Sequence, residues 1–152
     1  MGVQKIDEQQ IHGENYDQIY EKVKNDQYAL SLGIQLTKFE AGFAEAVLEV
    51  QNHMVNAHGT VHGAVIYALA DHAFSVACNA YGKTSVGLST NIQFIAAAIP
   101  GDKITARTTE IKRNFRTGFY RIDIFHDEKM IATMDAVAYR KDQYFIDLDE
   151  KG

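Results

Sequence analysis

The chain has 152 residues, of which 46% are hydrophobic and 23% charged, a balance typical of a globular protein with a sizeable core. The net charge of −5 argues against nucleic acid or an acidic membrane as the main partner. The single cysteine, Cys78, excludes an intrachain disulfide and favours a reducing compartment. The first ten residues, MGVQKIDEQQ, lack the apolar segment of a secretory signal, so we expect a cytoplasmic protein with no membrane partner.

Hydrophobic periodicity predicts a helix and then paired strands in the first third of the chain. In residues 15–24, apolar side chains recur at spacings of three and four, which predicts an amphipathic helix. Between residues 33 and 50, apolar and charged residues alternate, which predicts strand with a hairpin turn at 40–42.

A long apolar helix is predicted at residues 62–81, with Gly82 as its C-terminal cap. Four strands are predicted after it, at residues 85–95, 103–114, 118–126 and 129–141. This order separates the helices from a largely antiparallel sheet, which is the α+β class. A curved sheet wrapped around the central helix would bury a helix that is apolar nearly all round.

Asp71 is the only carboxylate in the stretch NAHGTVHGAVIYALADHAFSVACNA, residues 56–80. Its helical neighbours are mostly apolar, so we expect its side chain to be buried and the pKa of its carboxyl to be raised. A buried, unpaired carboxylate costs free energy. It therefore either pairs with a histidine or arginine from elsewhere or acts as a general base or nucleophile, and we favour the second role.

The glycine-rich segment HGTVHG, residues 58–63, leads into the same helix. Free N–H groups and a partial positive charge at a helix N-terminus suit an oxyanion or a polarised carbonyl, although an ordinary turn has the same composition. Asp71 lies about 12 Å of helical rise beyond Gly63, whereas a catalytic carboxylate must come within about 3 Å of its target. An antiparallel helix of a two-fold partner would close that gap, so we expect sites shared across a homo-oligomer.

Asn56 either orients a water or a carbonyl group or serves as a turn residue. Four histidines suggest a metal site, but only Asp71 offers a nearby carboxylate, so we expect neither a metal nor another cofactor. These histidines are His53, His58, His62 and His72. Cys78 is expected to pack in the core.

A basic run, KRNFRTG at residues 112–118, interrupts the acidic background. Arg113 and Arg116, with Thr117 and Gly118, form either a solvated hairpin end or a site that holds phosphate groups through arginine forks. The sequence leaves both interpretations open.

Several short motifs occur along the chain in a recognisable order: Asn56, His62-Gly63, Leu69-Ala70-Asp71, Ala73-Phe74 and Ala77-Cys78-Asn79, then Gly101-Asp102, Arg116 to Tyr120, Ile122 to Ile124 and Lys129 to Ala132. With these motifs, the chain resembles the hotdog-fold acyl-CoA thioesterases of the phenylacetic-acid-degradation type, from about Tyr20 to Arg140. The resemblance implies one hotdog domain over residues 1–152, with an N-terminal helical extension of about residues 1–32, in dimers or tetramers. It also implies metal-free thioester hydrolysis, with coenzyme A as part of the substrate.

By match of motif, Asp71 would be the catalytic carboxylate and the Gly63 amide the group that polarises the carbonyl. Asn56 would orient the water and His62 would support the glycine. The chain departs from many relatives at Ala64, where they have a second glycine, and at Gly87, where some have a serine or threonine. In relatives that serine or threonine is a polar residue that assists the reaction, and Ser89 and Thr90 are the nearest polar residues that could replace it here.

Hydrolysis of an aryl-acyl or medium-chain acyl-CoA is the function that we favour. Two alternatives remain from the sequence. One is a non-catalytic acyl-CoA-binding module, and the other is a dehydratase or hydratase of an acyl thioester that uses His62 or His72.

Overall fold

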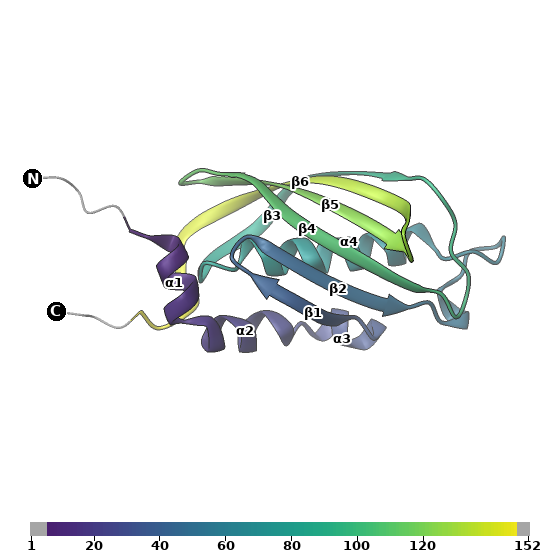
Figure 1. The fold of residues 1–152 in the computed structure, drawn as a ribbon, viewed down its shortest axis with the longest axis horizontal. Helices are drawn as coiled ribbons and strands as arrows, with labels where there is room; N and C mark the ends of the chain where they lie inside the picture. The colour runs from purple at the N-terminus through teal and green to yellow at the C-terminus, as the bar shows by residue number, and fades with distance from the viewer. Residues whose placement is uncertain (1–5, 149–152) are drawn as a thin grey trace, which may run out of the picture.

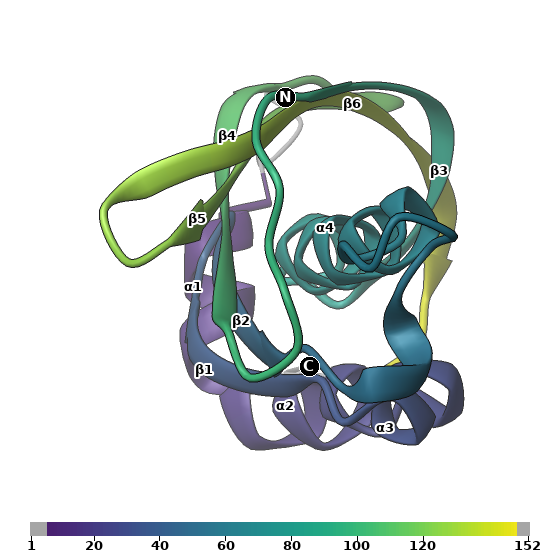
Figure 2. The same ribbon diagram turned by 90° about the vertical axis from the view of Figure 1, so that its right-hand side faces the viewer.

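The computed structural model describes residues 6–148, in which a curved sheet wraps around one central helix, α4 (Gly63–Cys78). The sheet has six strands in the order β1-β2-β4-β5-β6-β3, and every neighbouring pair is antiparallel. Its strands are β1 (Gln35–Glu40), β2 (Phe43–Glu49), β3 (Lys83–Phe94), β4 (Lys103–Arg113), β5 (Thr117–His126) and β6 (Lys129–Tyr144). Figures 1 and 2 show α4 in the hollow of this sheet. The expected α+β class is confirmed.

The strands lie close to their predicted places because period-two alternation marks which face of each strand is buried. The hairpin between β1 and β2 turns at Ala41 and Gly42, and Gly42 has a φ of 70° that favours glycine. Two predictions were too short: β3 begins at Lys83 rather than at residue 85, and β6 continues to Tyr144 rather than ending at 141.

The helix α4 is shorter than predicted at its C-terminal end. It ends at Cys78, and Asn79 is its C-cap. The Asn79 amide donates to the carbonyls of Ser75 and Ser85 and accepts from the Ser85 N–H, so the chain leaves the helix there. Gly82, expected as the cap, instead lies in the turn before β3, with a φ of 75°.

Three short helices precede the sheet, where the sequence predicted one. They are α1 (Glu8–Glu14), α2 (Tyr16–Lys24) and α3 (Gln27–Leu32). Only α2 is long enough to show a clear apolar period, whereas Asp7 and Asp26 cap the two shorter helices. Figure 2 shows α2 and α3 running beneath α4. The predicted N-terminal extension includes these three helices, and its residues 1–5 lie outside the described part of the chain.

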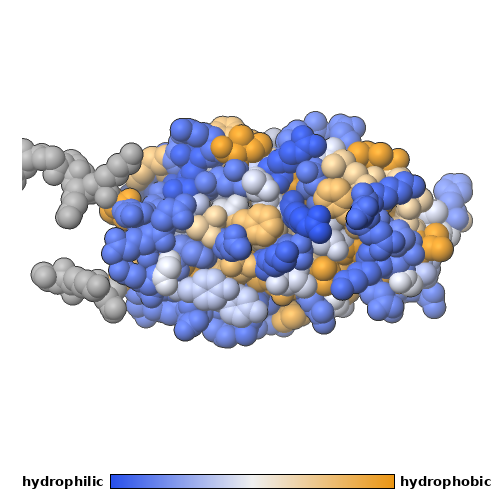
Figure 3. Space-filling view, in the orientation of Figure 1, coloured by the Kyte–Doolittle hydropathy of each residue, from blue (hydrophilic) through white to orange (hydrophobic). Residues whose placement is uncertain are grey.

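The surface over β1, β2 and β4 is largely hydrophilic, and its apolar residues lie in small separate groups (Figure 3). Within residues 6–148, no helix is long and apolar enough to cross a membrane. The cytoplasmic location stays a prediction.

Candidate active site

The N-terminus of α4 is held in place by a short irregular segment from residues 52 to 62. The 3-10 helix η1 (Asn52–Met54) leads into it, and the N–H of His62 donates to the carbonyl of Met54 at 2.7 Å. The N–H of Val61 donates to the carbonyl of Ala98 at 2.8 Å. These bonds join the helix entry to the loop after β3, so the position of the first helical turn is well defined.

His62 is the N-cap of α4. Its Nδ1 atom accepts a hydrogen bond from the N–H of Ala64 at 3.1 Å, which satisfies one of the free donors of the first turn. Because Nδ1 accepts, this geometry corresponds to a neutral imidazole with its proton on Nε2. Among the described residues, the Gly63 N–H has no hydrogen-bond acceptor, so it is available to a ligand.

A cavity of about 400 Å³ opens at this helix end. Its lining residues come from the helix entry, α4 and the loop after β3: Asn56, Thr60, Val61, Gly63, Ile66, Phe94, Ile95, Ala96 and Ala97. The ring of Phe94 covers Gly63, because a Cβ atom at Gly63 would lie 3.2 Å from Cζ of Phe94. A mostly apolar cavity with the free Gly63 amide in its wall suits an acyl group that ends in a polarisable carbonyl.

Asn56 lines the same cavity, but its side chain is engaged in the turn that it begins. Its Oδ1 atom accepts from the N–H groups of His58 at 2.9 Å and Thr60 at 3.3 Å, and its Nδ2 donates to Oγ1 of Thr60 at 3.0 Å. The turn alternative is therefore realised in the structure. The water-orienting role of Asn56 stays a prediction.

Asp71 is exposed in the isolated chain, which corrects the expectation of a buried acid in a fully enclosed helix. One stripe of α4 is covered neither by the sheet nor by α2 and α3. The members of this stripe are exposed or half-buried and share one helix face: Ala64, Tyr67, Ala68, Asp71 and Ser75. Ala64, Tyr67 and Ala68 are residue types that are common in a core, and the sequence does not show which neighbour covers them.

The carboxyl of Asp71 still has a pKa above its ordinary value. Partial desolvation is the largest cause, and the negative charge of Asp26 adds to it, whereas His72 acts in the opposite direction. Asp26 was not predicted as part of the site. It is the N-cap of α3, where its Oδ1 accepts from the Ala29 N–H at 2.9 Å.

His72 lies under the turn between α2 and α3, with 6% of its surface exposed. Its Nδ1 atom is 3.7 Å from Oδ2 of Asp26, and burial lowers the pKa of its imidazole. The Asp26-X-X-Ala29 capping pattern is visible in the sequence, but its approach to α4 is a tertiary contact that no local signal predicts.

Gly63 and Asp71 do not share a cavity within one chain. Asp71 is absent from the residues that line the space beside Gly63. The two positions are two turns of helix apart, about 12 Å. The geometry of the isolated chain therefore agrees with the helix arithmetic from the sequence.

The basic hairpin between β4 and β5 divides its arginines between two roles. Arg113 is engaged internally: its Nη1 donates to Glu110 at 2.8 Å and to the hydroxyl of Tyr81 at 2.6 Å, and its Nε is 3.6 Å from Glu8. Arg116 is exposed and stacks on the ring of Phe115 at 4.7 Å.

Thr117 and Gly118, predicted with these arginines, begin β5. The Thr117 carbonyl accepts from the Asn114 N–H at 2.7 Å, which closes the hairpin. Gly118 is buried, and a Cβ atom there would lie 2.7 Å from the Tyr120 ring. Both positions have structural reasons for their residue types, and their contacts with substrate stay predictions.

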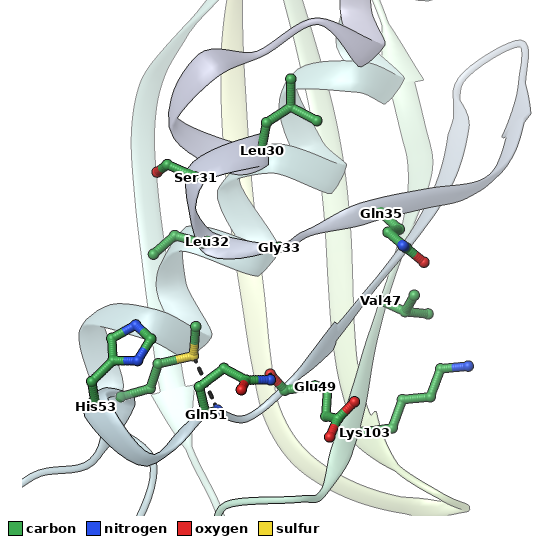
Figure 4. Close-up of a pocket in the computed structure, with 11 residues that line it drawn as sticks. Leu30, Ser31, Leu32, Gly33, Gln35, Val47, Glu49, Gln51, His53 and Lys103 are labelled. Carbon is green, nitrogen blue, oxygen red and sulfur yellow. Dashed lines mark hydrogen bonds between the residues drawn. The ribbon is translucent and has the colours of Figure 1, made fainter.

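A larger cavity of about 520 Å³ lies between α3, the ends of β1 and β2, and η1. Figure 4 shows polar and charged side chains along its wall, among them Glu49, His53 and Lys103. It shares no lining residue with the cavity at Gly63. No predicted site residue lies in it, so we place the candidate active site at the helix N-terminus. Within residues 6–148, no three His, Cys, Asp or Glu side chains cluster closely enough to hold a metal ion.

Comparisons with known proteins identify the family of the chain. The model of the thioesterase superfamily matches residues 58–133, which include the helix entry, α4 and the strands β3 to β5. The acyl-coenzyme A thioesterase PaaI of Escherichia coli is 33% identical over 118 residues, which are 77% of this chain and 84% of that protein. A putative esterase of Archaeoglobus fulgidus is 29% identical over 123 residues, 80% of each chain.

Two solved structures are similar along most of their length. The PaaI protein from the phenylacetic acid degradation operon of E. coli has a TM-score of 0.81 and 30% identity, over 91% of this chain and 99% of that one. A mutant of the phenylacetic acid degradation protein PaaI from Thermus thermophilus has a TM-score of 0.75 and 31% identity, over 76% and 100%. The family model and these relatives together show that the chain belongs to the thioesterase superfamily and has its hotdog fold.

Proposed function

We propose that the chain is an acyl-CoA thioesterase that hydrolyses its substrate at sites shared by two copies of the chain. The free Gly63 N–H at the end of a mostly apolar cavity is the observation that carries this proposal. That amide and the positive end of the α4 dipole would polarise the thioester carbonyl and stabilise the oxyanion that forms on attack. We propose an aryl-acyl or medium-chain acyl group as the occupant of the cavity.

In this mechanism, the carboxylate of Asp71 from the partner chain accepts a proton from water as the water attacks the carbonyl carbon. The C–O bond forms, the C–S bond then breaks, and the coenzyme A thiolate takes up the proton. Attack by the carboxylate itself, through an anhydride that water hydrolyses, gives the same products. The oxyanion donor contributes about 3 kcal/mol and the general base about 3–5 kcal/mol to the barrier reduction.

Two features of the surface support a homodimer. The exposed stripe on α4 contains Asp71, and β3 is an edge strand with one unpaired side. Its Val86 and Leu88 are 43% and 62% exposed, an arrangement that favours pairing with another strand. We propose that two chains join their β3 edges and face their α4 stripes in antiparallel orientation, which brings Asp71 beside the Gly63 of the partner. A tetramer of such dimers agrees equally well with these features.

The phosphates of coenzyme A would be held at the β4–β5 hairpin. Arg116 is the cation that we propose for this role, because its guanidinium is exposed whereas that of Arg113 is paired with Glu110. Arg113 then positions the hairpin from beneath, and it would reach a phosphate only after releasing Glu110 and Glu8.

The substitution Asp71→Asn tests the proposal. It removes the base and keeps the shape, so we expect kcat with a good acyl-CoA to fall at least about hundredfold, with the dimer intact. Thiol release over a panel of acyl-CoAs measures the rate, and sedimentation measures the assembly. Asp127→Asn, in the exposed β5–β6 turn, is the matched control and should keep wild-type turnover.

Retention of more than about a tenth of the wild-type kcat by Asp71→Asn would contradict its assignment as the base. Wild-type protein that binds acyl-CoA without releasing thiol would show a binding module instead. Loss of the double bond of a crotonyl-type substrate without thiol release would show a hydratase.

A further inference from the structure

In the proposed dimer, one residue on the exposed stripe of α4 lies midway between Gly63 and Asp71. If Gly63 of one antiparallel helix faces Asp71 of its partner, the residue midway between them faces its own copy. That residue is Tyr67, four positions from each. Its side chain is half-buried and lies on the same helix face as Asp71.

The edge strand β3 has a midpoint of its own, found without reference to the catalytic residues. Lys83 and Ser85, near its start, are buried, whereas all residues from 86 to 94 are exposed or half-buried. The centre of this free stretch is Thr90. Antiparallel pairing of the stretch with its own copy is centred there when the whole free edge is used.

The two midpoints contact each other. The hydroxyl of Tyr67 lies 3.0 Å from Oγ1 of Thr90, in a hydrogen bond that joins α4 to β3. A two-fold axis relates each residue on it to its own copy. The helix and the strand therefore place the same axis at one spot, from different observations.

We infer that the two-fold axis of the dimer passes beside the Tyr67–Thr90 contact, and that the two Tyr67 rings form the wall between the two active sites. This inference rests on the proposed function. Helical side chains lean toward the helix N-terminus, so each ring leans toward the Gly63 end of its own helix. Thr90 holds the hydroxyl and thereby fixes the ring. The wall limits the length of the acyl group, which makes Tyr67 a specificity-determining residue.

Cysteine substitution tests the position of the axis. Packed helices have axes about 8–10 Å apart and Cα radii of about 2.3 Å, so facing Cα atoms lie roughly 3.4–5.4 Å apart, a range that overlaps the roughly 4–7 Å that a disulfide requires. We expect Tyr67→Cys to form a disulfide-linked dimer under mild oxidation. Thr90→Cys, on the paired strands, should do the same. Native Cys78 is buried, and burial raises the pKa of its thiol to about 12, so it should not interfere.

Ser75→Cys is the matched control, because Ser75 lies on the same helix face, about 12 Å of rise from Tyr67. Its two copies would be too far apart to bridge. A dimer in which neither Tyr67→Cys nor Thr90→Cys crosslinks, or in which Ser75→Cys does, would overturn the inferred axis. A wild-type protein that is monomeric at assay concentrations would overturn it as well.

Substrate profiles test the wall. Tyr67→Ala should raise kcat/KM for longer acyl-CoAs relative to short ones by about tenfold or more, because the ring no longer blocks the chain. Tyr67→Phe loses the hydrogen bond to Thr90 but keeps the bulk of the ring, so its profile should stay much closer to wild type than that of Tyr67→Ala. An unchanged ratio in Tyr67→Ala would contradict the wall. The proposed function would then still stand, provided that wild-type protein releases thiol and Asp71→Asn does not.

Discussion

The two ends of α4 are built in opposite ways. At its N-terminus, His62 satisfies one donor, the Gly63 N–H stays free, and an open cavity lies beside them. Beyond its C-terminus, Tyr81 is buried between charged groups: its hydroxyl donates to Glu110 at 3.0 Å and accepts from Arg113 at 2.6 Å. One end is left open to a ligand, and the other is closed by side chains from distant parts of the chain.

The closed end also fixes the N-terminal helices. Arg140, with 1% of its surface exposed, pairs with Glu8 of α1 and donates to the Asn114 carbonyl at 2.8 Å. His12 of the same helix donates from Nδ1 to the Ala80 carbonyl at 2.6 Å. The helix α1 is therefore attached to the domain through polar contacts with three separate segments, at Ala80, Arg113 and Arg140.

The difference follows from the charge at each helix end. The positive N-terminus favours an anion, and in the proposed mechanism the anion is the transient oxyanion of the substrate. The negative C-terminus favours cations, and Arg113 and Arg140 lie 3.9 Å and 5.9 Å from the ring of Tyr81, just beyond it. A substitution at Gly63 should therefore lower the catalytic rate, whereas a substitution at Arg140 should lower the stability of the fold.

The largest expected effect is on stability, for Arg140→Gln. Removal of the buried cation takes the closer of two cations from Glu8, with Arg113 still 3.6 Å away, and leaves the Asn114 carbonyl without its donor. We therefore expect a loss of about 3 kcal/mol in the free energy of unfolding. Urea unfolding measures it. Arg121→Gln, which removes an exposed pair with Asp123, is the control and should cost at most about 1 kcal/mol. Equal effects of the two substitutions would show that the buried network does not stabilise the closed end.

A smaller effect, on catalysis alone, is expected for Gly63→Ala. The new Cβ atom would come within 3.2 Å of the movable Phe94 ring and would narrow the approach to the free N–H. We expect kcat/KM to fall about hundredfold, which is the scale of losing one oxyanion donor. The unfolding midpoint in urea should stay near that of wild type, because alanine is a good helix former. A large loss of stability with unchanged kcat/KM would reverse the proposed division between the ends.

The architecture could be predicted because each strand and the central helix has a hydrophobic pattern within its own stretch of sequence. Alternation marked the strands, and the apolar run with its glycine-rich entry marked α4 and the open end. The exposed stripe of that helix could not be predicted, because Ala64, Tyr67 and Ala68 have the composition of core residues. Only the fold shows that the sheet leaves them uncovered.

The closed end could not be predicted because its partners are distant in sequence. Arg113 and Arg116 are alike in type and three positions apart, yet one is paired inside the fold and the other is free. The difference depends on Glu110, three positions earlier on β4, and on Glu8 of α1, more than 100 positions earlier. A helix as short as α1 shows too little hydrophobic periodicity to be predicted from the sequence, so its contact with Arg113 could not be predicted either.

The smallest expected effect concerns Asp26, which contacts the central helix midway between its two ends. Activity requires ionised Asp71, and desolvation together with the negative charge of Asp26 raises the pKa of that carboxyl above 3.8. Asp26→Asn removes the charge and keeps the α3 cap, because asparagine caps helices as well as aspartate does. The pKa of Asp71 should fall, so the acid limb of kcat/KM should move to lower pH while the plateau rate is unchanged. Because desolvation remains, the pKa of Asp71 should still lie above its ordinary value in this variant. Asp17→Asn, exposed on α2, should leave the profile unchanged, and a shift of the Asp26→Asn limb toward higher pH would show that Asp26 does not act on Asp71 through its charge.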